Sequence, residues 1–114
     1  MSDEMAKTAY DALDEKLSQD IRILKIDEIS VISDYLIIAS ADNQNQIKAM
    51  LDNVLLKMSM AGYEAPKIEG NKNSTWILMD YKDVIVHIFS TEDRLFYDLE
   101  RIWSDGKNIN REDL

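Results

Sequence analysis

The side chains best suited to acid–base or metal chemistry lie close together in one stretch of the chain. His87 is the only histidine in the sequence, and Asp80 and Asp83 precede it. A lone histidine in an apolar strand is more often a hydrogen-bonded structural group than a general base. The two aspartates flank an expected turn, where this residue type is favoured for conformational reasons. Two carboxylates would hold a hard cation only nonspecifically, so we expect no metal site.

Catalysis by a nucleophile or on a bound phosphate has little support in this sequence. The chain has no cysteine, and its three glycines cannot form a glycine-rich phosphate loop. No serine lies in a nucleophile-elbow pattern. The turn at residues 40–43 offers backbone N–H groups to an anion, but Asp42 would compete for the same donors. We therefore expect neither catalytic residues nor a cofactor.

The spacing of apolar residues predicts the elements that must position these side chains. Apolar stripes at helical spacing indicate a first helix from Ser2 and a second helix from a cap at Asp42 to a stop at Gly62. Ser90 is the expected cap of a last helix. Strands are expected at residues 21–26, 35–40, 67–70, 75–80 and 84–89.

This order of elements predicts an α/β sandwich of two or three layers, with a mixed sheet of about five strands and helices packed on it. The segment 35–40 lacks polar–apolar alternation, so we expect it to be central in the sheet. Residues 1–105 are predicted to form a single domain. A polar tail at residues 106–114 is expected to fray.

The composition limits the class of partner. The chain has 114 residues, of which 46% are hydrophobic, and a formal net charge of -9. An acidic surface repels phosphate backbones, so primary nucleic-acid binding is not expected, whereas a basic protein would be attracted. No apolar segment approaches the ~20 residues of a membrane helix. The acidic start of the chain and the lack of cysteine favour a cytoplasmic location.

The predicted hairpin at residues 75–89 is the most informative segment for binding. Alternation places Trp76, Leu78 and Asp80 on one face of its first strand, and Ile77 and Met79 on the other. The first face ends in a carboxylate, which indicates that it is the wetter one. An exposed tryptophan beside leucine and aspartate is typical of a protein-binding hot spot. Packing of Trp76 under a helix remains the alternative.

The same segment carries a family resemblance. The run of residues 76–89, WILMDYKDVIVHIF, together with the later residues Arg94, Trp103 and Asp105, closely resembles the ribosomal silencing factor family, also called Iojap-like. The likeness extends over nearly all of residues 5–105. Two positions depart from the usual pattern: Ala41 stands where many relatives have glycine, and Thr75 precedes the tryptophan.

The resemblance implies a small sandwich related to the nucleotidyltransferase scaffold, without enzyme activity. It also implies a stress-response repressor of translation that binds the large ribosomal subunit through its protein number fourteen, at the intersubunit face. Occupation of that face prevents the small subunit from joining. The partner-binding residues that the resemblance implies are Trp76, Leu78, Met79, Asp80, Tyr81 and Asp83.

Two other hypotheses stay open at the level of sequence. A degenerate nucleotidyltransferase would hold Mg²⁺ on Asp34, Asp80 and Asp83, and a triphosphate on the turn at residues 40–43. A homodimer would use spare apolar surface on the second helix or an edge of the sheet. The helix residues expected at such a dimer surface are Met50, Leu56 and Met60.

Overall fold

The computed structural model describes residues 2–16, 19–28, 33–70, 75–92 and 106–114. Its elements are α1 (Ser2–Asp14), β1 (Gln19–Lys25), β2 (Tyr35–Ala41), α2 (Gln44–Met60), β3 (Lys67–Glu69), β4 (Trp76–Asp80), β5 (Val84–Ser90), β6 (Lys107–Ile109) and the short 3₁₀ helix η1 (Arg111–Asp113). The predicted last helix falls largely on residues 93–105, outside the described residues. No helix in the described ranges is both long and apolar enough to cross a membrane.

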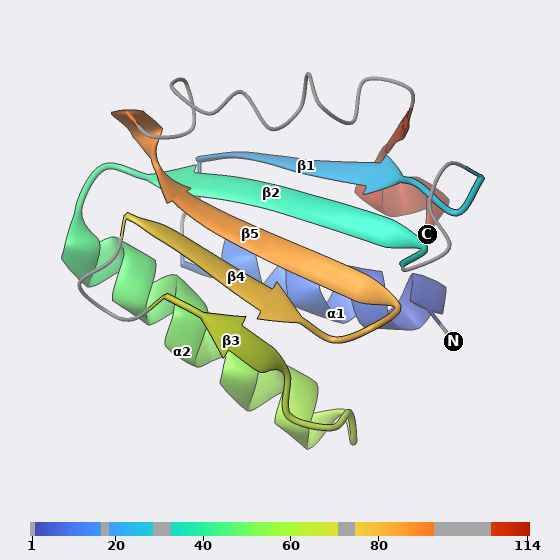
Figure 1. Cartoon of the computed structure of the whole chain (residues 1–114), viewed down its shortest axis with the longest axis horizontal. Coiled ribbons are helices and arrows are strands. Elements are labelled where there is room, and N and C mark those ends of the chain that lie inside the picture. The colour runs from blue at the N-terminus through green and yellow to red at the C-terminus, as the bar shows by residue number, and fades with distance from the viewer. Residues whose placement is uncertain (1, 17–18, 29–32, 71–74, 93–105) are drawn as a thin grey trace.

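The strands form one mixed sheet with α1 and α2 packed together on one of its faces (Figure 1). Among the described residues the sheet has six strands in the order β3-β4-β5-β2-β1-β6. The central pair β2 and β5 is parallel, and the other neighbouring strands are antiparallel. The α/β sandwich with a mixed sheet is therefore confirmed, with one strand more than the five expected.

The main core lies between the two helices and the facing side of the sheet. All seven residues of β2 are buried, which confirms that this strand is central. Helix α1 contributes mostly small side chains to the core, so it can approach α2 and the sheet closely. Its buried residues are Ala6, Ala9, Ala12 and Leu13.

Helix α2 begins one residue later than the sequence predicts. Its N-cap is Asn43, whose side-chain Oδ1 accepts a hydrogen bond from the backbone N–H of Gln46 at 2.8 Å. Asp42, the predicted cap, instead accepts a hydrogen bond from the hydroxyl of Thr91. The shift arises because β2 continues through Ala41, which leaves Asp42 in the connection. At the other end, Gly62 has φ +91° directly after the helix, so the predicted glycine stop is confirmed.

The polar C-terminal tail is ordered, which corrects the prediction that it frays. Strand β6 pairs antiparallel with β1 and is the edge strand on that side of the sheet. The guanidinium of Arg111 makes two hydrogen bonds to the carboxylate of Asp11 on α1, at 2.8 and 3.0 Å. Leu114 packs against the main core. The tail is held by backbone pairing, one bidentate ion pair and the apolar contacts of Ile109 and Leu114 with the core, and none of these needs an apolar stripe in the sequence.

Candidate functional site

The hairpin of β4 and β5 carries the residues that the sequence singles out. Trp76 pairs with Phe89, Leu78 with His87 and Asp80 with Ile85. The connecting turn is shaped by Asp80, whose Oδ1 accepts a hydrogen bond from the backbone N–H of Lys82 at 2.8 Å. Lys82 has φ +75°, a conformation stabilised by this local bond. Asp80 thus has the conformational role that its position before a turn predicts.

The two faces of β4 differ in burial as the sequence predicts. Ile77 and Met79 are fully buried against the core that α1 and α2 cover. Trp76, Leu78 and Asp80 point to the opposite face and are each half-buried. Trp76 therefore does not pack under α1 or α2, and the face that ends in a carboxylate is the wetter one.

A second, smaller apolar cluster lies on this outer face of the sheet. Trp76 and Ile85 stand at its margin and are only partly buried. Its fully buried members are Leu24, Ile26, Leu36, Ile38 and Phe89. The partly exposed Trp76 thus packs against a buried apolar cluster, and binding hot spots are typically found in such well-packed surroundings.

Trp76 is held by two ring neighbours on β5. Its indole Nε1–H donates a hydrogen bond to Nδ1 of His87 at 3.0 Å. Its ring stacks on Phe89 with centroids 5.0 Å apart and 25° between the planes. His87 is 5% exposed, and burial lowers its pKa to about 4. His87 is therefore a neutral, hydrogen-bonded strand residue, as its isolation in the sequence predicts.

Two of the six predicted partner-binding residues, Met79 and Tyr81, point inward. Met79 is fully buried. Tyr81 is 7% exposed, and burial raises its pKa to about 12. The Tyr81 hydroxyl has no hydrogen-bond partner among the residues that the structure describes. The reason is strand alternation: both side chains share a face with Ile77. Trp76, Leu78, Asp80 and Asp83 remain accessible.

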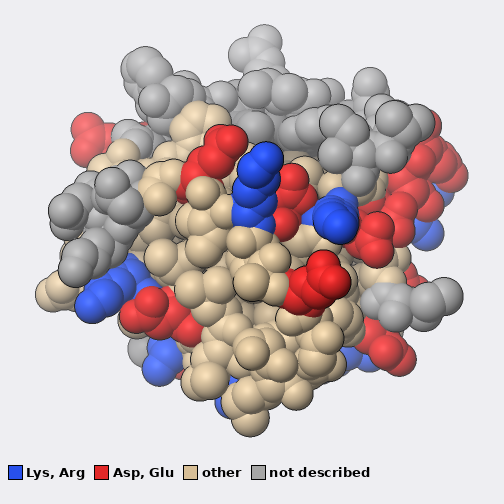
Figure 2. Space-filling model, turned by 60° about the horizontal axis from the view of Figure 1, so that its bottom comes forward, with Lys and Arg blue, Asp and Glu red and all other residues tan. Residues whose placement is uncertain are grey.

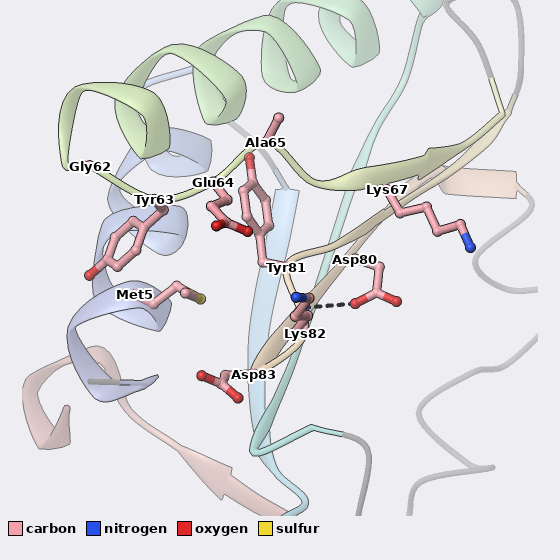
Figure 3. Close-up of a pocket in the computed structure, with 10 residues that line it drawn as sticks. All are labelled: Met5, Gly62, Tyr63, Glu64, Ala65, Lys67, Asp80, Tyr81, Lys82 and Asp83. Carbon is pink, nitrogen blue, oxygen red and sulfur yellow. Dashed lines mark hydrogen bonds between the residues drawn. The ribbon is translucent and has the colours of Figure 1, made fainter.

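A hollow of about 510 Å³ adjoins the turn of the hairpin (Figure 3). Its walls come from α1, from the segment after α2, from β3 and from the turn itself. The residues that line it are Met5, Gly62, Tyr63, Glu64, Ala65, Lys67, Asp80, Tyr81, Lys82 and Asp83. Sequence reasoning missed Tyr63 and Glu64 here, because only the return of the chain through β3 brings them beside the hairpin.

The nucleotidyltransferase hypothesis needs residues that the fold keeps apart. Asp34 and Asp83 adjoin the starts of the parallel strands β2 and β5, where the Asp34 N–H donates to the Asp83 carbonyl at 2.8 Å. The turn at residues 40–43 lies at the other end of β2. A seven-residue strand spans about 20 Å, so the proposed metal ligands and the proposed triphosphate turn do not form one site. Within the described ranges, no three acidic or histidine side chains gather as a metal site.

Apolar surface is also exposed away from the hairpin. The large hydrophobic side chains most exposed in the described residues are Leu56, Met60 and Ile68. Figure 2 brings the side of α2 and β3 forward and shows a broad uncharged area bordered by charged side chains. Met50, expected at this surface, is fully buried instead, so only Leu56 and Met60 of the three predicted helix residues are available to a partner.

Comparison with known proteins gives a consistent result. A family model described as ribosomal silencing factor during starvation matches residues 1–114. A ribosomal silencing factor of Zymomonas mobilis is 35% identical over 102 residues, which cover 90% of this chain and 77% of that protein. Another, from Halalkalibacterium halodurans, is 29% identical over 109 residues and covers 96% and 93% of the two chains. A crystal structure of a Chromobacterium violaceum protein has a TM-score of 0.88 at 30% identity, covering 96% of this chain and 91% of that one.

Proposed function

Because this chain belongs to the family of ribosomal silencing factors, we propose that it docks on the large ribosomal subunit and keeps the small subunit from joining. The proposed docking surface is the outer face of the β4–β5 hairpin, with Trp76, Leu78 and Asp80, together with the exposed Asp83 of the adjoining turn (Figure 3). The proposed contact on the ribosome is the large-subunit protein number fourteen, at the intersubunit face. Translation is then repressed by occupation of a surface, without a chemical step.

The half-burial of Trp76 and Leu78 supports this proposal most strongly. Tryptophan is the residue type most enriched among energetic hot spots of protein interfaces. Here its ring rests on Phe89, so its orientation is already set before a partner arrives. A rigid aromatic anchor loses little conformational entropy on binding, and this favours affinity.

The charge of the chain supports a basic partner. The formal net charge is -9, the half-buried carboxylate of Asp80 shares the face of the apolar anchors, and Asp83 is exposed on the adjoining turn. Such carboxylates pair with lysine and arginine side chains of a ribosomal protein and repel bare RNA. Association should therefore weaken as salt is raised, because charge steering is screened at distances beyond about 10 Å in 0.1 M salt.

The proposal is tested by co-sedimentation of the chain with isolated large and small subunits, followed by an assay of subunit joining. We expect the chain to sediment with large subunits only and to lower the yield of joined ribosomes in proportion to its occupancy. Equal binding to both subunits, or binding that leaves joining unchanged, would contradict the proposal. A salt series in the same assay measures the electrostatic part.

We also propose that the chain forms a homodimer through the exposed face of α2. Leu56 is 54% exposed and Met60 is 72% exposed, and both lie outside the hairpin surface. Sedimentation of the wild type and of Leu56→Lys compares the two states, and a dimer that the substitution separates is the expected result. A monomeric wild type at high concentration would exclude this dimer and leave the docking proposal unaffected.

A further inference from the structure

The hydrogen bond between Trp76 and His87 ties the proposed anchor to a buried side chain of the neighbouring strand. His87 pairs across the strands with Leu78, so Trp76 is its diagonal neighbour on the same face. The indole N–H points at the imidazole Nδ1, with 3.0 Å between the two nitrogens. The polar edge of the indole is thus turned toward His87, and the side chain stays partly exposed.

This geometry fixes the chemical state of His87. An indole nitrogen only donates, so Nδ1 of His87 must accept and carries no proton. The imidazole is then neutral, with its proton on Nε2. His87 also stacks on Phe89, with centroids 6.0 Å apart and 11° between the ring planes. Phe89 in turn stacks on Trp76, so three rings brace one another on the outer face.

We propose that His87 is a positioning residue, which holds the indole of Trp76 in the orientation that docks on the partner. The inference rests on the proposed function, since it takes Trp76 as the anchor. Without the acceptor at Nδ1, the indole N–H would seek water and the ring would sample other rotamers. Only molecules with the indole in the docking-competent rotamer would then bind. The apparent affinity would be the intrinsic affinity multiplied by the fraction of these molecules.

The first test is the affinity for isolated large subunits of His87→Leu and His87→Asn. Leucine fills the space without an acceptor, whereas the Asn side-chain oxygen lies near the position of the imidazole Nδ1. We expect His87→Leu to bind roughly threefold to tenfold more weakly, the cost of ordering one side chain at an interface. His87→Asn should recover most of the loss. Equal losses in both variants would overturn the positioning role.

A double-mutant cycle with Trp76→Phe shows whether His87 acts through the indole. Phenylalanine keeps an aromatic ring but has no N–H group for His87. In the Trp76→Phe background, His87→Leu should cause no further loss of affinity. Additive losses would show that His87 affects docking by another route and would contradict the proposal.

The indole N–H signal in the proton–nitrogen NMR spectrum gives a readout that does not depend on ribosomes. The Trp76 signal is identified by its absence in Trp76→Phe. It should move toward the position of a water-exposed indole in His87→Leu and return in His87→Asn. An unchanged signal in a folded His87→Leu would overturn the proposal. If His87→Leu does not fold, an indole signal of His87→Asn at the wild-type position and weaker docking of Trp76→Phe support the proposal. A displaced signal in His87→Asn, or wild-type docking of Trp76→Phe, would overturn it.

Failure of this inference is separable from failure of the proposed function. If Trp76→Ala docks as tightly as the wild type, the proposed docking role of the hairpin surface is rejected. Loss of docking in Trp76→Ala combined with normal docking of folded His87→Leu would reject only the positioning role.

Discussion

The two faces of β4 differ in their surroundings: the inner face packs in the core, and the outer face is partly exposed. Met79 on the inner face is fully buried in the core beneath the helices, and Leu78 on the outer face is half-buried beside Trp76. The inner face has a complete set of apolar neighbours, whereas the outer face offers apolar surface that is still partly exposed. Because side chains alternate along a strand, a residue that stabilises the core, such as Met79, can lie next to a residue of the proposed binding surface, such as Leu78. The predictions below test this separation of the two faces.

The largest effect is expected from Met79→Ala on the inner face. Removing a fully buried methionine side chain should lower the free energy of unfolding by about 3 kcal/mol, because the core cannot fill the space. Urea unfolding monitored by circular dichroism measures this loss. Leu78→Ala is the matched control on the outer face, and it should cost less than half as much stability while weakening docking. A reversed order of the two stability losses would contradict the separation of faces.

The next largest effect is expected from protonation of His87, which should lower the free energy of unfolding at acidic pH. In the folded chain burial lowers the pKa of His87 to about 4, and in the unfolded chain the pKa is near its ordinary 6.5. The unfolded state therefore binds the extra proton first, so stability is complete above pH 6.5 and falls as the pH drops toward 4. At pH 5 the loss should be on the order of 2 kcal/mol.

Unfolding curves of wild type and His87→Asn at pH 7 and pH 5 measure this contribution. Because His87 is the only histidine, the difference between the two proteins isolates it. The wild type should lose more stability than the variant over this interval. Equal losses would mean that the imidazole is accessible to protons in the folded state.

The smallest effect is expected from Tyr81→Phe on the inner face. The Tyr81 hydroxyl is buried without a partner in the described part of the chain, so its removal breaks no hydrogen bond there. The free energy of unfolding should stay within about 0.5 kcal/mol of the wild type or increase. Docking should also be unchanged, because the ring faces the core. A loss above about 1.5 kcal/mol would show that the hydroxyl is satisfied in solution.

The features that the sequence predicted correctly rest on local periodicity. The burial of β2 follows from its unbroken apolar run, and the two faces of β4 follow from strict alternation. The isolation of His87 among apolar residues predicted a structural role, and its bond to Trp76 agrees with that. These signals are local, because each depends only on which way a side chain points from a regular backbone.

The errors arose where distant segments decide the structure. Two of the three side chains of β6, Lys107 and Asn108, are polar and exposed, and the strand exists because β1 offers it an unpaired edge. Tyr63 and Glu64 reach the hollow beside the hairpin only after β3 folds back, and no spacing along the chain signals that.

The affinity of Trp76→Ala for isolated large ribosomal subunits tests the central claim most directly. Leu56→Ala, which also shortens an exposed apolar side chain but lies on α2, is the control. If Trp76 is a central anchor, its removal should weaken docking by about 2 kcal/mol or more, close to thirtyfold, while Leu56→Ala binds as the wild type does. Wild-type affinity in a folded Trp76→Ala would contradict the account.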